Sequence, residues 1–114
     1  MTTKYKAGPI VTEVKRLQKE FPEAMYINKS GMSCSYSKGS VSKGPKTRGC
    51  IIGQAIRVVY PELFKIAKEK FDSVVVGDLI DNLGIEATDG QLAYLIETQQ
   101  NQDVGRRWGG REFI

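Results

Sequence analysis

The sequence predicts a single small α+β domain, residues 1–114, that is dominated by helices and carries a short N-terminal β-hairpin. Apolar residues recur at helical spacing in several separate stretches, and turn formers divide two short extended stretches. A length of 114 residues with 40% apolar content suffices for one hydrophobic core without metals or disulfides. We find no internal repeat and no linker long enough to separate two domains.

The first helix is predicted to open at Gly8 and Pro9 and to end at Pro22. Its core face repeats at helical spacing through Ile10, Val14, Leu17 and Phe21. Two short strands, 24–27 and 32–36, are expected on either side of a turn and would form the hairpin. The following segment, 37–49, is rich in glycine and serine, which predicts a mobile loop.

Two helices are predicted after this loop. The first begins at Gly49 or Cys50 and runs to Tyr60, and apolar residues cover most of its surface, so we expect it to be the central element. Pro61 suits the first turn of the second helix because its missing N–H would be unpaired there in any case. The lysines of this second helix are expected to face solvent: Lys65, Lys68 and Lys70.

The next element depends on three consecutive valines, 74–76. β-Branched residues favour a strand, but Asp72 or Ser73 could cap a helix that runs to Leu83, and we favour the helix. Gly84 then predicts a helix stop in the left-handed conformation.

The last helix has the clearest start signal, because Thr88 and Gln91 have the spacing of a capping box. It is predicted to stop at Gly105. Its polar end, 99–102, could contact a base edge or a partner strand, but an exposed helix end explains it equally well. The tail, 106–114, contains Trp108, which we expect to close the core.

Charge is sorted along the chain, although the net charge is only +4. Residues 24–61 contain six bases and no acid, whereas residues 71–105 contain seven acids and no base. Such a division can create a positive surface for a polyanion, or it can let two halves of one domain attract each other.

The candidate binding residues lie in the basic loop and in the tail. Glycine and serine separate the loop cations, so backbone N–H groups could reach a phosphate beside them, and the helix start at Gly49 would add partial positive charge. The segment 44–49, GPKTRG, lacks the spacing of a Walker loop, and a solvated loop explains it equally well. The predicted phosphate- or partner-binding residues are Lys38, Lys43, Lys46, Arg48, Arg106, Arg107 and Arg111.

Composition argues against catalysis and metal binding. The chain has no histidine, which excludes Ser/His/Asp and Cys/His nucleophile systems. Cys34 and Cys50 cannot complete a four-ligand zinc site, and we expect both to be small free thiols. Asp78 and Asp81 would share a helix face, where a solvated surface is the simpler interpretation. We therefore predict a non-enzymatic protein without a cofactor or metal.

The apolar runs are too short to span a membrane, and the polar N-terminus lacks the apolar region of a signal peptide. We expect a cytoplasmic protein.

Two blocks of the sequence resemble short uncharacterised proteins of actinobacteria and their phages. One block is CIIGQA, 50–55, and the other is QQNQDVGRRW, 99–108. The resemblance implies a cytoplasmic protein of phage origin, acting in the host cytoplasm, and it implies no activity or ligand. In physical terms the blocks could be packing partners, with Trp108 covering the small residues Gly53 and Ala55.

Three functions remain open on the sequence alone. Nucleic-acid binding, to DNA or RNA, follows from the basic loop and is placed first. An inhibitor or adaptor of a host protein follows from the small size and the acidic second half. A binder of a phosphorylated small ligand would use the same loop beside a concave site.

Overall fold

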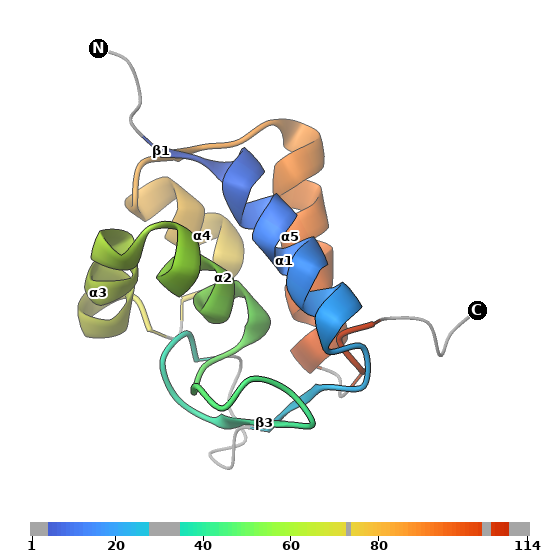
Figure 1. Cartoon of the computed structure of the whole chain (residues 1–114). Coiled ribbons are helices and arrows are strands. Elements are labelled where there is room, and N and C mark those ends of the chain that lie inside the picture. Colours follow the sequence, from blue (N-terminus) through green and yellow to red (C-terminus); the bar gives the residue numbers. More distant parts are fainter. Residues whose placement is uncertain (1–4, 28–34, 73, 104–105, 110–114) are drawn as a thin grey trace.

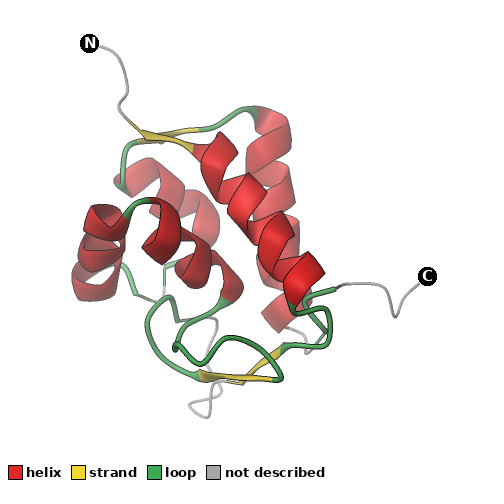
Figure 2. Ribbon diagram, viewed as in Figure 1, coloured by secondary structure: helices red, strands yellow, loops and turns green. Residues whose placement is uncertain are grey.

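Helices form most of the molecule, with a pair of short strands at each end (Figures 1 and 2). The computed structural model describes residues 5–27, 35–72, 74–103 and 106–109. The predicted helix-dominated α+β class is confirmed. In chain order the elements are β1 (Tyr5–Lys6), α1 (Ala7–Glu20), β2 (Met25–Ile27), β3 (Ser40–Ser42), α2 (Ile51–Val59), α3 (Pro61–Lys70), α4 (Val76–Asn82), β4 (Ile85–Glu86) and α5 (Asp89–Asp103).

The core lies where α1, α2 and α5 pack together. Residues at helical spacing on these helices, such as Ile10 on α1, Ile52 and Ile56 on α2 and Leu95 on α5, are each 0% exposed. Burying a side chain of this size stabilises a fold by about 1.5–3 kcal/mol. The predicted central position of α2 is therefore confirmed. Within the described residues, no helix is long and apolar enough to cross a membrane.

The two strand pairs lie at opposite ends of α1 (Figure 2). β1 pairs in parallel with β4, and β2 pairs antiparallel with β3, where Tyr26 lies opposite Val41. Because α1 has 14 residues, it separates the two ends by about 21 Å, at 1.5 Å per residue. Each end of the helical bundle thus has two short strands joined by backbone hydrogen bonds.

The second strand of the predicted hairpin is misplaced. We expected 32–36, but the described part of that range, Ser35 and Tyr36, is not in a strand, and 32–34 lie outside the described residues. The partner of β2 is instead β3, inside the segment expected to be a loop. Serine–valine–serine alternation suits a half-buried strand, and Val41 packs against the core.

Instead of forming the expected strand, residues 35–37 lie directly against α2. The N–H of Cys50 donates to the carbonyl of Ser35 (2.9 Å), and the N–H of Tyr36 donates to the carbonyl of Asp72 (3.0 Å). Gly53 makes this approach possible, since a β-carbon there would lie 2.1 Å from the carbonyl oxygen of Tyr36. The expectation that Trp108 covers Gly53 is therefore wrong, because the Tyr36 backbone occupies that place.

Only the last of the three valines lies in a helix, so the favoured helix exists but begins later than predicted and has a different cap. α4 begins at Val76, and the N–H of Val76 donates to Oε1 of Gln99 on α5 (3.0 Å). The Asp72 carboxylate instead accepts hydrogen bonds from Ser35 and Ser37. Gly84 then ends the helix with φ +69°, the predicted left-handed stop.

The capping box at the start of α5 is confirmed, because the Thr88 N–H donates to Gln91 Oε1 and the Gln91 N–H donates to Thr88 Oγ1. The expectation of an exposed polar end of α5 is wrong for Gln99 and Gln102, whereas Gln100 is exposed. Gln99 and Gln102 are only 7% and 4% exposed, and Gln102 Oε1 accepts from the N–H of Ile51 at the start of α2 (2.8 Å). Both glutamines therefore cap neighbouring helices through their side-chain oxygens.

Candidate functional site

Every predicted binding residue that the structure describes is exposed. The loop cations flank β3 and continue toward α2, and the tail cations follow α5. Arg111 lies outside the described residues. The exposed cations, which we call the basic end, are Lys38, Lys43, Lys46, Arg48, Arg106 and Arg107.

The two halves of the basic end meet at Ala24, just before β2. A β-carbon on Gly44, in the middle of the loop, would lie 2.9 Å from the side chain of Ala24. On the other side, the N–H of Trp108 donates to the carbonyl of Ala24 (2.8 Å). Cations that are some 60 residues apart in sequence are therefore carried by neighbouring segments, on the side of the fold that bears β2 and β3 (Figure 1).

The loop backbone is anchored to the fold at several points. Tyr26 donates its hydroxyl to the carbonyl of Lys38 (2.9 Å), and the Gln54 amide donates to the carbonyls of Thr47 (2.7 Å) and Gly49 (3.2 Å). The bonds from Ser35 and Ser37 to Asp72 fix the start of the same segment. None of these contacts uses a lysine or arginine side chain, and the side chains of Lys38, Lys43, Lys46 and Arg48 are exposed.

The ion pair at the loop is long and exposed. Lys43 Nζ lies 3.9 Å from Glu23 Oε1, with both side chains about two-thirds exposed (70% and 67%), and such surface pairs contribute little. The Lys6–Glu86 pair lies on β1 and β4, at the far end of α1. A Lys–Glu pair thus lies at each end of α1, and Asp72, from the acidic half of the sequence, bonds to the start of the basic loop. The charge division seen in the sequence is therefore not a division between the two ends of the fold.

Contrary to the prediction, the start of α2 does not add its partial positive charge to this surface. The N–H groups of Cys50 and Ile51 already donate to the Ser35 carbonyl and to Gln102, and both residues are 0% exposed. A phosphate at the basic end would thus be bound by side chains and loop backbone rather than by this helix terminus.

Comparison with known proteins does not assign this surface a function. No family model, no curated protein and no solved structure matches the chain. Within the chain, the two sequence blocks 50–55 and 99–108 do pack together, as anticipated, through Ile51, Gln102 and Trp108. Their contacts are those of helix capping and core closure, and Trp108 is buried as expected, at 3% exposure.

A cleft next to the basic end is lined by two cations of α1 that are not among the predicted binding residues. It has a volume of about 330 Å³ and is lined by Lys15, Gln18 and Lys19 of α1 together with Pro22 and Gly109. The spacing 15, 18, 19 places these three side chains on one helix face, and this signal was present in the sequence. Only the fold shows that Gly109, the residue after Trp108, lines the same cleft.

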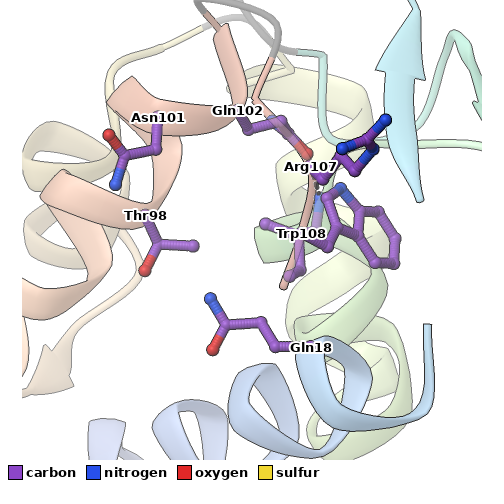
Figure 3. Close-up of a pocket in the computed structure, with 7 residues that line it drawn as sticks. Gln18, Thr98, Asn101, Gln102, Arg107 and Trp108 are labelled. Carbon is purple, nitrogen blue, oxygen red and sulfur yellow. Dashed lines mark hydrogen bonds between the residues drawn. The ribbon is translucent and has the colours of Figure 1, made fainter. Parts of the chain in front are cut away.

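A second, smaller cavity of about 30 Å³ (Figure 3) shares the lining residue Gln18 with this cleft. Its other lining residues come from α2, from the end of α5 and from the segment that follows α5. They are Ile51, Thr98, Asn101, Gln102, Arg107 and Trp108.

Cys50 offers no reactive thiol, because it is buried and disulfide-bonded. We expected a free thiol on the assumption of a reducing compartment, which the sequence itself does not report. Cys34 lies outside the described residues. Asp78 and Asp81 are exposed, as anticipated for a solvated surface, and the described part of the chain holds no cluster of three or more potential metal ligands.

Proposed function

We propose that this protein binds nucleic acid by contacting phosphates with the basic end, and that it acts by binding rather than by catalysis. The observation that carries the proposal is the meeting of the two cationic segments at Ala24. Phosphate contacts require exposed lysine and arginine side chains on a defined backbone, and the anchored loop supplies both.

The proposal predicts a steep salt dependence. If about five phosphates are neutralised, the logarithm of the affinity falls with the logarithm of the salt concentration at a slope of about −4 to −5. The measurement is fluorescence anisotropy of labelled double-stranded DNA, single-stranded DNA and RNA, titrated with protein from low to physiological salt. Comparison of the three probes identifies the preferred nucleic acid.

A pair of triple variants separates a local surface from net charge. The test variant combines Lys43→Glu, Lys46→Glu and Arg48→Glu, which reverses charge at the basic end. The control changes net charge by the same amount on the exposed face of α3 through Lys65→Glu, Lys68→Glu and Lys70→Glu. We expect the first variant to lose binding and the second to retain most of it.

Two results would count against nucleic-acid binding through this surface. An equal loss in both triple variants would show a general charge effect. Absence of binding by the unaltered protein at low salt would contradict the proposal. It would favour the alternative function, that of an inhibitor or adaptor that contacts a host protein.

The adjoining cleft favours a second candidate, a phosphorylated small ligand. Its volume of about 330 Å³ lies at the lower end of the range for ligand sites, and Lys15 and Lys19 would face the phosphate. Saturable binding of a mononucleotide that is lost in Lys15→Glu and Lys19→Glu variants, but not in the loop variant, would favour this candidate.

We place this activity in the cytoplasm, or in the host cytoplasm if the gene belongs to a phage, on the strength of the two sequence blocks. Disulfides are rare in that compartment. Counting the free thiols of protein isolated from its native cells therefore tests the placement, since a Cys50 disulfide that persists there would contradict it.

A further inference from the structure

The small cavity at the end of α5 contains two buried N–H donors that have no hydrogen-bond partner. They are Nε2 of Gln102 and Nε1 of Trp108, the only such buried side-chain atoms among the described residues. The two side chains are 4% and 3% exposed, and both line the cavity. Buried polar groups are almost always paired in folded proteins, so a pair of unpartnered donors at one cavity indicates a place for an acceptor.

The side-chain amides at the cavity already use their oxygen atoms as hydrogen-bond acceptors. Gln102 Oε1 accepts from the Ile51 N–H, and Gln18 Oε1 accepts from the Tyr94 hydroxyl (2.6 Å). Asn101 Oδ1 accepts from the Arg106 guanidinium (2.7 Å). These bonds fix the orientation of each amide and leave its NH₂ group as the remaining donor. The lining is therefore rich in donors, and the described residues that form it include no carboxylate.

The size and charge of the surroundings narrow the class of occupant. A volume of about 30 Å³ corresponds to roughly two water-sized spheres, at about 10–15 Å³ each, and so admits an end group rather than a whole ligand. Arg107 lines the cavity and is exposed at its edge, and Lys15 and Lys19 line the adjoining cleft. Positive charge on both sides favours an anionic acceptor over a neutral carbonyl.

We propose that this cavity is a binding site for a terminal oxyanion, whose oxygens accept hydrogen bonds from Trp108 Nε1 and Gln102 Nε2. The class comprises a carboxylate and a terminal phosphate, each of which presents two or more oxygens at the end of a molecule. An internal phosphodiester is excluded by the small volume, because a sugar continues from it on both sides. The site does not depend on nucleic-acid binding at the basic end.

The single tryptophan of the chain provides a direct reporter, since its indole N–H gives one resolved signal in a ¹⁵N correlation spectrum. The experiment titrates the labelled protein with inorganic phosphate or with formate, and separately with chloride at matched ionic strength. We expect the indole signal and the Gln102 side-chain NH₂ signals to shift and to saturate with phosphate or formate. Linear shifts that chloride reproduces would overturn the proposal, as would a signal that does not move because only water occupies the cavity.

Gln102→Glu provides the decisive variant. It retains an oxygen acceptor for the Ile51 N–H but replaces the unpartnered NH₂ by a negative oxygen, so we expect affinity for the oxyanion to fall about tenfold to a hundredfold. Gln100→Glu is the matched control, because it makes the same charge change on an exposed residue of the same helix. Equal losses in the two variants would contradict a specific site.

A second variant covers the case in which Gln102→Glu fails to fold. Trp108→Phe removes the indole donor while retaining an aromatic ring, and the Gln102 NH₂ signals then report binding. Unchanged affinity in this variant would overturn the assigned role of Trp108.

A last comparison identifies the source of the oxyanion. Oligonucleotides with a 5′-phosphate and with a 5′-hydroxyl are titrated in parallel. A saturating indole shift with only the phosphorylated form supports a nucleic-acid end as the occupant, and a shift with neither form but with free phosphate or formate supports a small molecule. Failure of nucleic-acid binding leaves the inorganic phosphate and formate results intact, so the two proposals are tested separately.

Discussion

We expect replacement of Gly53 by alanine to destabilise the protein, although this substitution usually stabilises a helix. Alanine in place of glycine normally stabilises a helix by about 1 kcal/mol. At this position the new β-carbon would lie 2.1 Å from the Tyr36 carbonyl oxygen and 2.7 Å from the Tyr36 Cα. Ordinary contacts begin near 3.4 Å, so either α2 or the Tyr36 backbone must move by more than 1 Å.

The size of the effect follows from what that movement disturbs. Tyr36 is fully buried, and the adjoining backbone is fixed by the hydrogen bonds of Tyr36 to Asp72 and of Cys50 to Ser35. Overpacking of a core costs about 1–3 kcal/mol, and a weakened hydrogen bond adds about 1 kcal/mol. After the helix-propensity gain of about 1 kcal/mol is subtracted, we expect Gly53→Ala to lower the free energy of unfolding by about 1–3 kcal/mol.

The assay is urea unfolding followed by circular dichroism, with Gly90→Ala as the control. Gly90 is also helical and lies in α5, and a β-carbon added there would meet no atom within 4 Å. We expect the control to be neutral or more stable by up to about 1 kcal/mol. If Gly53→Ala proves as stable as the unaltered protein, the close approach of residues 35–37 to α2 is refuted.

Three further predictions follow from single contacts. Burial raises the pKa of Tyr36 above its ordinary value of 10.0. The Tyr36 hydroxyl therefore stays protonated to a higher pH in the folded state than in the unfolded state. Stability should then fall by about 1.4 kcal/mol per pH unit above pH ~10 from this group. Urea unfolding of Tyr36→Phe should show a smaller slope, although burial also raises the pKa of Tyr94, which remains in the variant. Gln102→Leu should cost about 1–3 kcal/mol in the same assay by leaving the buried Ile51 N–H unpaired, and equal stability would contradict that cap. Glu86→Gln, at an exposed pair with Lys6, should change thermal stability by less than about 1 kcal/mol.

Local signals in the sequence predicted the helices well. The Thr88–Gln91 capping box and the Gly84 stop depend on residues within one turn of each other, so their physics is complete in the sequence. The helical stripe through Ile10 and Val14 likewise identified one face of the core. Exposure of the loop cations could also be predicted, because lysine and arginine are rarely buried without a partner.

Contacts between distant segments could not be predicted from these signals. Gln99 and Gln102 look like a solvated helix end, and only the packing of α5 against α2 and α4 brings their oxygens to the unpaired N–H groups of Val76 and Ile51. Asp72 had the position of a helix cap, but Ser35 and Ser37 are better placed to donate to it. In each case a polar group found a partner more than 20 residues away.

By itself, the sequence determined the helical class, the charge division and the absence of histidine chemistry, because periodicity, composition and residue type are local properties. The tertiary structure alone decided that the two cationic segments meet at Ala24 and that Gln102 and Trp108, each with a buried unpartnered N–H group, line one cavity. The physical reason is that hydrogen bonding and packing are satisfied between elements, and a glutamine that caps a neighbouring helix has the same sequence signature as one in water.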